Sequence, residues 1–530
     1  MNRILTLYIP FIFFINILYI APLVPFESNQ TYYNSIQPLH ELLNNKLHNN
    51  VQWSHETYSH NTNMQVYQNT PLWTKETLDM TGDVGRYSSI AIDSSGSISI
   101  SYYDHFNGNL KLLSNTNETW IYEVIDQQGD VGLYTSLAID SNGFRHISYY
   151  DTINQDLKYA QETSQGWQIQ TIATTGNVGI DASLILDSKD NPHICYYDAT
   201  QANLIYIFWN GQQWQSDIID NTPGSGHGCD IAIDTQDNIH ISYSNIHDSL
   251  LYYALLEKDE WQINCVDTET AVFASTAIAI DSQNQPHICY YDVPSPSLPW
   301  LLRYATQKNG RWNIEIIDPD LKYFWNDYGC DITIDRFDRV HVGYYKWNKW
   351  DLGYALKNRN TWVLETVESD GSIGAFAAIT INDKGYPHIS YMDLNNLALK
   401  HAEKKQFAPD IPLPPEGPNI GSTERNYTIT IQTTDFDNDA VFYAIDWGDN
   451  SSIEWTENTP SGIPVNISHQ YTSRGQYEIR VQAQDTHGHL SPWSEPLDTI
   501  MIKSKNSWPY QECFKYLSQI KNNYMKNTYG

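Results

Sequence analysis

Short apolar runs alternate with polar turns along most of the chain, and one such unit recurs at a nearly fixed spacing. Each copy has an apolar run, an acidic turn and a second run rich in tyrosine and usually histidine, as in TSLAIDSNGFRHISYYD. The copies span residues 88–104, 135–151, 182–198, 229–245, 276–292, 330–346 and 377–393. Their anchor residues are 47 residues apart except for one interval of 54: Asp93, Asp140, Asp187, Asp234, Asp281, Asp335 and Asn382.

This period predicts an all-β fold with a seven-bladed β-propeller, because repeats of about 40–50 residues with several short strands are typical of propeller blades. We expect each copy to form an inner strand such as SLAID, a tight turn, an HISYYD strand, a short third strand and an outer strand opened by tryptophan. Gly and Asn in the first turn supply the positive φ that a tight hairpin needs.

Seven tryptophans are in phase with the copies, but the first precedes the first copy: Trp73, Trp120, Trp167, Trp214, Trp261, Trp312 and Trp362. The last copy ends at 397–405 with no tryptophan strand after it. The ring therefore closes only if residues 72–79 supply the outer strand of the last blade. Such closure removes the open sheet edges that a chain of blades would expose.

Histidine recurs at one position in six copies: His146, His193, His240, His287, His341 and His388. Each lies in a different blade, so the six are too far apart to share one metal ion. We interpret them as structural, in hydrogen-bond reach of the Asp that ends an inner strand. The six cysteines include no CxxC pair, which argues against a zinc site. Buried thiols that fill small core positions are favoured over disulfides.

The repeated pattern A-I-D-S-x-G-x-x-H-I-S-Y-Y-D resembles the tandem repeats of exported bacterial and archaeal propellers over residues 72–405. Such propellers include sugar-binding lectins, sialidases and lyases, so the resemblance implies a fold rather than one activity. Sialidases resemble one another in S-x-D-x-G-x-T-W boxes and an arginine triad. No complete box occurs here, and the arginines of the repeats are few and scattered, so a sialidase is disfavoured.

A proline-rich stretch at 407–419 predicts a semi-rigid spacer after the repeats. The strand-like segment 420–502 resembles the polycystic-kidney-disease (PKD) domain, an immunoglobulin-like β-sandwich of exported proteins. The match rests on TTDFDNDAVFYAIDWGDN (433–450), HQYTSRGQYEIRVQAQD (469–485) and HGHLSPWSEP (487–496). Asn450 stands where the family usually has glycine, a departure that affects one turn. The resemblance implies spacing or adhesion rather than chemistry.

The apolar run from Ile4 to Pro25 is typical of a secretory signal peptide, although no clear small-x-small cleavage site follows it. An uncleaved membrane anchor is the alternative, because about 20 apolar residues can span a bilayer. Either case predicts an extracellular or cell-surface protein, with the membrane as partner only through the anchor. The predicted parts are the signal or anchor (1–27), a polar linker (28–69), the propeller (70–405), a proline-rich linker (406–419), the sandwich (420–503) and a polar tail (504–530).

The net charge of the chain restricts the classes of partner that it can bind. The formal net charge is -31 and no basic stripe interrupts the acidity, which argues against binding to nucleic acid. Acidity also raises the question of cations. Asp435, Asp437 and Asp439 have the alternating spacing of calcium-coordinating loops, while the full twelve-residue helix-loop-helix pattern is absent. A calcium site and a plain acidic turn are the two interpretations, and no other cofactor is expected.

The sevenfold regularity fails in two connections, 293–300 and 319–329, which together lengthen one interval from 47 to 54 residues. These connections are expected on one rim of the ring. They bring aromatic and acidic side chains together there: Trp300, Tyr323, Phe324, Trp325, Trp347, Trp350, Asp292 and Asp327. Exposed aromatic residues are costly unless they pack or bind, and their flat faces suit a sugar ring. We expect a ligand site at this rim, or else aromatics that only cap the longer loops.

The chain has no G-x-S-x-G elbow, H-E-x-x-H zinc motif or phosphate-binding glycine loop. We therefore expect a noncatalytic binding or adhesion protein whose partner is an extracellular glycan or a surface protein. A propeller hydrolase or lyase acting on extracellular polysaccharide is one alternative, because such enzymes place their sites in scattered loops. A structural component of a surface layer is the other.

Overall fold

The computed structural model describes residues 72–116, 119–268, 272, 275–292, 300–321, 329–358 and 361–502. The predicted signal peptide or anchor, the polar linker and the polar tail lie outside this part of the chain. Strands are the regular elements of the described ranges, which contain no helix long and apolar enough to cross a membrane.

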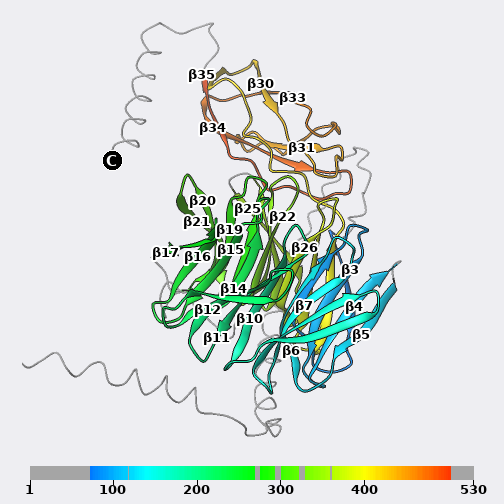
Figure 1. Ribbon diagram of the computed structural model, residues 1–530. Coiled ribbons are helices and arrows are strands. Elements are labelled where there is room, and N and C mark those ends of the chain that lie inside the picture. Colours follow the sequence, from blue (N-terminus) through cyan, green and yellow to red (C-terminus); the bar gives the residue numbers. More distant parts are fainter. Residues whose placement is uncertain are drawn as a thin grey trace, which may run out of the picture. The chain divides into compact units, whose positions relative to one another are not determined.

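Seven four-stranded antiparallel sheets form the propeller, as predicted (Figure 1). Blade 1 consists of β2 (Val84–Ile92), β3 (Ile98–Asp104), β4 (Asn109–Thr116) and β5 (Thr119–Asp126). Blade 2 consists of β6 (Val131–Ile139), β7 (Arg145–Asp151), β8 (Asp156–Thr163) and β9 (Gly166–Ala173). Blade 3 consists of β10 (Val178–Leu186), β11 (Pro192–Asp198), β12 (Asn203–Trp209) and β13 (Trp214–Asp220). Blade 4 consists of β14 (Ser225–Ile233), β15 (Ile239–Asn245), β16 (Leu250–Glu257) and β17 (Glu260–Asp267).

The remaining three blades repeat this order with one substitution. Blade 5 consists of β18 (Thr276–Ile280), β19 (Pro286–Asp292), β20 (Trp300–Lys308) and β21 (Arg311–Leu321). Blade 6 consists of β22 (Cys330–Ile334), β23 (Val340–Lys346), β24 (Asp351–Asn358) and β25 (Thr361–Glu368). Blade 7 takes β26 (Ile373–Ile381), β27 (Pro387–Asp393) and β28 (Ala398–Lys404) from the end of the repeats and β1 (Trp73–Asp79) from their beginning.

The ring is closed by β1, which confirms the prediction made from the tryptophan count. It pairs antiparallel with β28, with Trp73 opposite Lys404. The inner strands β2 and β26 contact each other, so the first blade packs on the last. Trp73 donates from its Nε1 to Glu365 of blade 6 at 2.8 Å and meets the ring of Tyr354 edge-on at 5.0 Å. The closing strand therefore joins the same inter-blade contacts as the outer strands of other blades.

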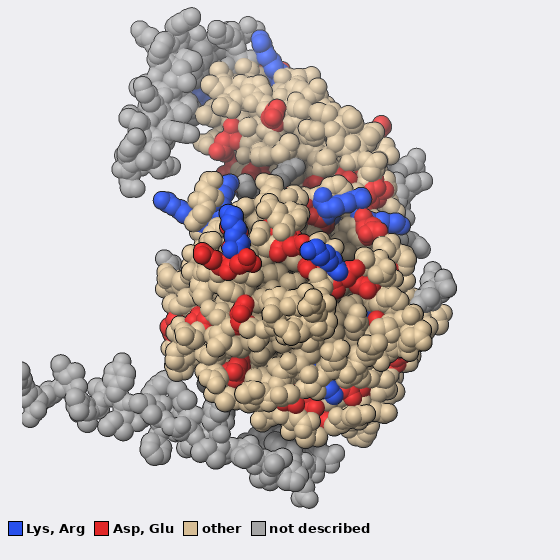
Figure 2. Space-filling model, in the orientation of Figure 1, with Lys and Arg blue, Asp and Glu red and all other residues tan. Residues whose placement is uncertain are grey.

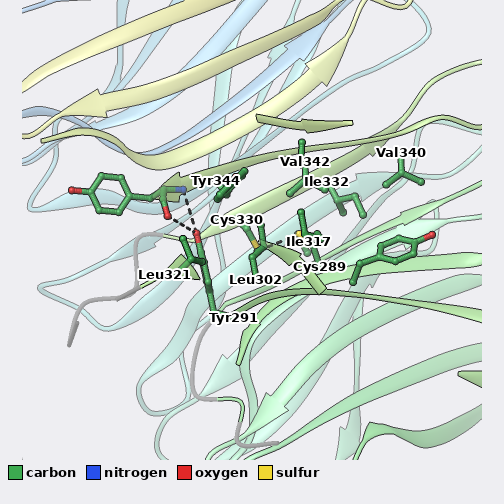
Figure 3. Close-up of a cluster of buried hydrophobic side chains, with 14 of the residues drawn as sticks. Cys289, Tyr291, Leu302, Ile317, Leu321, Cys330, Ile332, Val340, Val342 and Tyr344 are labelled. Atoms are coloured by element: carbon green, nitrogen blue, oxygen red, sulfur yellow. Dashed lines mark hydrogen bonds between the residues drawn. The ribbon is translucent and has the colours of Figure 1, made fainter. Parts of the chain in front are cut away.

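The hydrophobic core lies between neighbouring blades. The second strands of blades 5 and 6 are buried along their whole length, since each is covered on both faces. Outer strands such as β5 alternate exposed and partly buried residues, because only one face meets a neighbour. Figure 3 shows one junction, where Cys289 and Leu302 of blade 5 meet Ile332 of blade 6. Burial of apolar surface of this kind stabilises a protein by about 25 cal/mol per Å².

The repeated histidines are structural, as the sequence indicated. His240 Nδ1 lies 2.6 Å from the Tyr253 hydroxyl, and its Nε2 lies 3.5 Å from the carboxylate of Asp234, which ends the inner strand. The same arrangement recurs at His146, His193, His287 and His341. Burial lowers the pKa of these histidines, which favours neutral rings. In blade 7, His388 has Asn382 and His401 as its partners.

The second domain is a β-sandwich. One sheet has the order β29 (Ile420–Ser422), β35 (Leu497–Ile502), β34 (Gly475–Gln484), β31 (Phe442–Asp446) and β32 (Glu454–Trp455). The other pairs β30 (Asn426–Ile431) with β33 (Val465–Gln470). Trp447 fills the core and is 1% exposed. Asn450 has a φ of 62°, so it adopts the left-handed conformation that glycine would have in this turn.

Removal of β1 tests the closure. A chain shortened to begin at Asp83 should unfold at a lower temperature and self-associate, because the edge of β28 would be unpaired. Size-exclusion chromatography and thermal unfolding measure both effects. A chain that begins at Leu72 keeps β1 and is the control. Equal unfolding temperatures and a monomeric state for both chains would show that closure by β1 is dispensable.

Candidate functional site

A bulge interrupts the inner strand of most blades near the axis of the ring. In blades 1 and 2 the register shifts between Arg86 and Ser89 and between Leu133 and Ser136. The bulge residues have left-handed φ angles: Tyr87 (52°), Tyr134 (52°), Asp181 (53°), Gly228 (54°) and Phe376 (55°). Gly329, at the equivalent position just before β22, has a φ of 71°. Glycine adopts this conformation freely, whereas other residues pay about 1–2 kcal/mol. The four non-glycine residues therefore occupy a conformation that disfavours them.

Three of these residues form an aromatic wall: Tyr87, Tyr134 and Phe376. They come from three consecutive blades, numbers 7, 1 and 2. The ring of Tyr87 lies 4.7 Å from that of Tyr134 and 4.5 Å from that of Phe376. All three side chains are half-buried, so part of each ring faces the solvent of the axis. At the equivalent positions of blades 4, 5 and 6 the chain has Gly228, Ser275 and Gly329, which leave space.

The wall and the small residues line a pocket of about 310 Å³ on the axis, here called the axial pocket. Its polar lining includes Ser88, Ser89, Thr135, Ser136, Asp181, Ser183, Asp230, Thr276 and Asp331. Three of the described lining residues are aspartates and none of them is lysine or arginine. The pocket thus combines flat apolar rings with hydroxyl and carboxyl groups in a negative field.

Two of the aspartates also connect neighbouring blades. Asp230 accepts hydrogen bonds from Ser183 Oγ at 2.6 Å and from the backbone N–H of Ile278 at 2.8 Å. Asp331 accepts from the backbone N–H of Ile379 at 2.8 Å. Burial raises the pKa of both carboxyls, and the charge of Asp230 helps to raise that of Asp331 to about 7. Both carboxyls therefore hold their protons to a higher pH than a free aspartate does.

The third aspartate faces a histidine. Asp181 Oδ2 accepts the backbone N–H of Gly228 at 2.9 Å and lies 4.0 Å from His227 Nδ1. The His227 ring rests on Tyr197, with ring centroids 3.9 Å apart. Burial lowers the pKa of His227 to about 4, so the imidazole is neutral at physiological pH. The neutral His227 therefore adds no positive charge beside the pocket.

The structure places four of the predicted rim residues. Asp292 is fully buried and ion-paired with Arg303, and Trp300 at the start of β20 is partly buried against the core between blades 5 and 6. Trp347 is 4% exposed and meets the ring of Tyr345 at 90°. Trp350 is 48% exposed.

The other four predicted rim residues, Tyr323, Phe324, Trp325 and Asp327, lie outside the described part of the chain. Of the placed aromatics, Trp350 is the most exposed. Its backbone has a φ of 65° in the turn between β23 and β24. This turn lies at the end of blade 6 where the inner strand begins, because Cys330 of β22 pairs with Tyr344 near the end of β23. That end of the blades also carries the axial pocket.

The predicted calcium residues come together in the sandwich. One ligand atom each from Asp435, Asp437 and Asp439 lies within 4.8 Å of the others, and Asp439 forms a second such group with Asp485 and His487. Asp435 is 5% exposed, and its Oδ2 has no hydrogen-bond partner among the described residues. Burial, with the neighbouring carboxylates, raises the pKa of Asp435 to about 7.

This donor set suits a hard cation such as Ca²⁺, which takes carboxylate oxygens. Asp437 is the weakest ligand of the set, because its two oxygens already accept from Tyr386 Oη at 2.5 Å and from the N–H of Phe407 at 2.7 Å. Asp435 and Asp439 would hold the ion; Asp485, which lies near Asp439, already accepts two backbone N–H groups and lies 2.7 Å from His489 Nδ1. Asp485 is distant in sequence, so the spacing of the acidic turn gave no sign of it.

The axial pocket was missed by sequence reasoning, although a signal existed. Its bulge residues stand six positions before each anchor residue, where the repeat shows no consensus: Tyr87, Tyr134, Asp181, Gly228, Ser275, Gly329 and Phe376. Variation at one fixed position of a regular repeat marks a site that the fold does not dictate.

On the face shown in Figure 2, the described Lys and Arg side chains mostly lie near Asp and Glu.

Comparison with known proteins identifies the sandwich. Residues 410–495 match the model of the PKD domain family. The PKD domain of an M14-like peptidase from a Thermoplasmatales archaeon is 34% identical over 19% of this chain and 100% of its own, with a TM-score of 0.18. No curated protein matches the sequence.

Solved propeller structures are similar at low identity. An α-L-arabinanase from Penicillium chrysogenum, complexed with arabinobiose, is 10% identical over 51% of this chain and 92% of its own, with a TM-score of 0.38. A fucose lectin from Kordia zhangzhouensis, complexed with methyl-fucoside, is 18% identical over 25% of this chain and 96% of its own, with a TM-score of 0.21. Likenesses of this strength do not bear on the activity of the chain.

Asp331 should make stability depend on pH. Its pKa is raised from 3.8 to about 7 in the folded state, so the folded protein keeps a proton that the unfolded chain loses. The free energy of unfolding should therefore fall as the pH rises from 3.8 to about 7. Asp331→Asn resembles the protonated carboxyl, so it should be more stable than wild type by about 4 kcal/mol at pH 8 but almost equally stable at pH 4.

Urea unfolding at both pH values measures this difference. Asp498→Asn, which changes an exposed carboxylate of β35, is the matched control and should leave the pH dependence intact. Parallel pH profiles for wild type and Asp331→Asn would contradict the raised pKa.

Calcium should bind the acidic cluster of the sandwich. Isothermal titration of the full chain with CaCl₂ should give one binding event that Asp435→Asn abolishes, because the substitution replaces a buried anionic ligand by an amide. Asp498→Asn should bind as wild type does. Equal calcium binding by the Asp435→Asn variant would exclude this cluster, and absence of any binding heat in wild type would exclude a calcium site.

Proposed function

We propose that this chain, a seven-bladed β-propeller that carries a member of the PKD domain family at residues 410–495, is an extracellular or cell-surface protein that binds carbohydrate without catalysis. Its ligand would enter the axial pocket. The rim bearing Trp300 and Trp350 would extend the site. The PKD domain would serve as a spacer or adhesion module rather than as part of the binding site.

The aromatic wall is the observation that carries this proposal. Tyr87, Tyr134 and Phe376 occupy a position where the same chain uses glycine in two other blades, and each has a positive φ. A non-glycine residue in this conformation costs about 1–3 kcal/mol and usually persists at sites of function. Three bulky rings held at such a cost, half-exposed around one cavity, indicate that the rings contact a ligand.

The chemistry of the pocket favours a sugar. Aromatic rings offer flat apolar faces to the C–H groups of a pyranose or furanose ring, while hydroxyl and carboxyl groups bond its hydroxyls. Ser89 and Ser136 are partly exposed beside the aromatic wall and supply hydroxyl groups of this kind. A volume of about 310 Å³ is at the small end of known ligand sites, which suits one or two sugar residues.

Charge makes the proposal more specific. Asp181, Asp230 and Asp331 line the pocket, and its described lining has no cationic side chain. An anionic sugar such as a sialic or uronic acid would meet repulsion without a compensating ion pair. The ligand class is therefore a neutral sugar or an amino sugar.

One observation favours the catalytic alternative. Asp230 and Asp331 both line the pocket and have raised pKa values, with that of Asp331 at about 7. Glycoside hydrolases use two carboxyl groups, one protonated and one ionised. Against this, Asp230 and Asp331 bond backbone N–H groups of the next blade, which gives both a structural role. A polysaccharide hydrolase therefore stands second, and sugar release that Asp331→Asn abolishes would favour it.

A substitution that relieves the backbone strain can distinguish a role of the aromatic wall in ligand binding from a role in folding. Tyr134→Gly removes one ring of the wall and places glycine where φ is 52°. We expect its affinity for the sugar to fall about tenfold or more, while relief of the strain offsets part of the lost ring contacts with Tyr87 and Tyr150, so that the variant stays folded. A glycan array of neutral, amino and acidic sugars identifies the ligand, and calorimetry gives the affinity.

The matched control is Phe106→Ala, which removes an aromatic side chain that is 74% exposed between β3 and β4, outside the pocket lining. It should bind as wild type does. If Tyr134→Gly kept full affinity, or if the array returned only acidic sugars, the axial pocket would not be the proposed site.

A further inference from the structure

One position in every junction between blades pairs a residue of an inner strand with a residue on the second strand of the preceding blade. At three junctions both partners carry hydroxyls. Thr135 donates to Ser101 at 2.8 Å, and the hydroxyls of Ser88 and Ser390 and of Thr276 and Ser242 lie 2.9 and 2.7 Å apart. All these oxygens are buried, so each pair satisfies two polar groups that would otherwise be costly.

At two junctions both partners are cysteines. Cys229 of blade 4 packs in the same buried cluster as Cys195 of blade 3, and its thiol donates to the backbone carbonyl of Asp181 at 3.2 Å. Cys330 of blade 6 faces Cys289 of blade 5, with the two sulfur atoms 3.1 Å apart (Figure 3). Cys195 and Cys289 are fully buried, while Cys229 and Cys330 are each 6% exposed. The structure describes these residues as thiols.

The matching of partners is specific. Hydroxyl faces hydroxyl and thiol faces thiol at five of the junctions, although the positions are 34 to 41 residues apart or further in sequence. At the junction between blades 2 and 3 the partner of Ser148 is Ala182 by position, and Ser148 Oγ is a buried oxygen with no hydrogen-bond partner among the described residues. At this junction position, every cysteine of the described residues faces another cysteine, whereas Cys265 lies on the outer strand β17.

We propose that Cys195–Cys229 and Cys289–Cys330 become disulfide bonds that join blade 3 to blade 4 and blade 5 to blade 6. Each bond forms when two thiols pass two electrons to the disulfide of a small molecule or a protein, which is reduced to two thiols. The two protons of the cysteines pass to those leaving thiolates. Export into an oxidising compartment would supply this oxidant.

The burial of the pairs sets the order of events. Burial raises the pKa of Cys229 and Cys289 well above that of a free thiol, which suppresses the thiolate needed for exchange. The bonds should therefore form while the blades assemble. Cys229 and Cys330 line the axial pocket, so a reagent that enters this pocket can reach them after assembly.

The bridge at Cys289–Cys330 closes a chain loop across 41 positions. That loop contains both connections whose length breaks the sevenfold pattern, 293–300 and 319–329. Cross-linking its two ends removes conformational freedom from the unfolded chain and ties blade 5, where both connections start, to blade 6, where the second one ends. The disulfide thus anchors the most irregular part of the ring.

The chain supplies a matched variant for the test. Cys289→Ser combined with Cys330→Thr recreates the Ser242 and Thr276 pair of the neighbouring junction, so it should fold with a satisfied hydrogen bond in place of the bridge. Wild type and variant are folded in a glutathione redox buffer. They are then unfolded in denaturant that contains N-ethylmaleimide, which labels every free thiol. Intact mass gives the number of free thiols, and peptide mapping gives the linked pairs.

Wild type should take two labels, at Cys265 and Cys513, and six after reduction; the variant should take two, and four after reduction. Reduction should lower the unfolding temperature of wild type by about 5 °C and that of the variant by less. Six labels on unreduced wild type, or bridges between other cysteines, would overturn the proposal. Because the readout is thiol content, it does not depend on whether the pocket binds sugar.

Discussion

The packing of each blade on the next is the constraint on which the whole molecule depends. A four-stranded sheet of this size has two faces to cover, and the second strands of blades 5 and 6 are buried from end to end only because a neighbour lies on each side. A ring satisfies this for every blade, whereas an open array would leave two faces and two edges exposed. The first and last blades must therefore meet, and β1 completes blade 7 to make that junction equivalent to the others.

Regular junctions in turn determine where the chain can vary. The His–Tyr–Asp hydrogen bonds and the Tyr–Trp ring contacts recur from blade to blade because they satisfy buried polar groups within and between sheets. Near the axis the strands converge and the bulge residues project into shared space, where no repeated contact is required. Tyr87 and Gly228 can occupy equivalent positions for this reason, and the axial pocket owes its asymmetry to such substitutions.

The repeat made the fold largely predictable. Seven in-phase copies predicted the number of blades, and the displaced Trp73 predicted how the ring closes. The structural role of the histidines was predicted because each lies in a different blade. The pocket was harder to predict, because its sign in the sequence is variation at one repeat position, and a tyrosine in a left-handed bulge stands where glycine is the residue expected. The acidic turn at Asp435 was visible, but Asp485 joins it only through the pairing of β31 with β34. Half of the predicted rim lies in segments outside the described residues.

Strain and cross-linking have complementary consequences in this ring. Aromatic residues at the bulges of blades 7, 1 and 2 lower the stability of that side by about 1–3 kcal/mol each. The cysteine pairs lie on the opposite side, at the junctions of blades 3 and 4 and of blades 5 and 6, where the equivalent bulge residues are small. A closed ring transmits the loss of any junction to all others, because opening one exposes two faces. Bonds that hold the blades far from the strained wall therefore stabilise the wall as well, and allow the pocket to keep its unfavourable backbone.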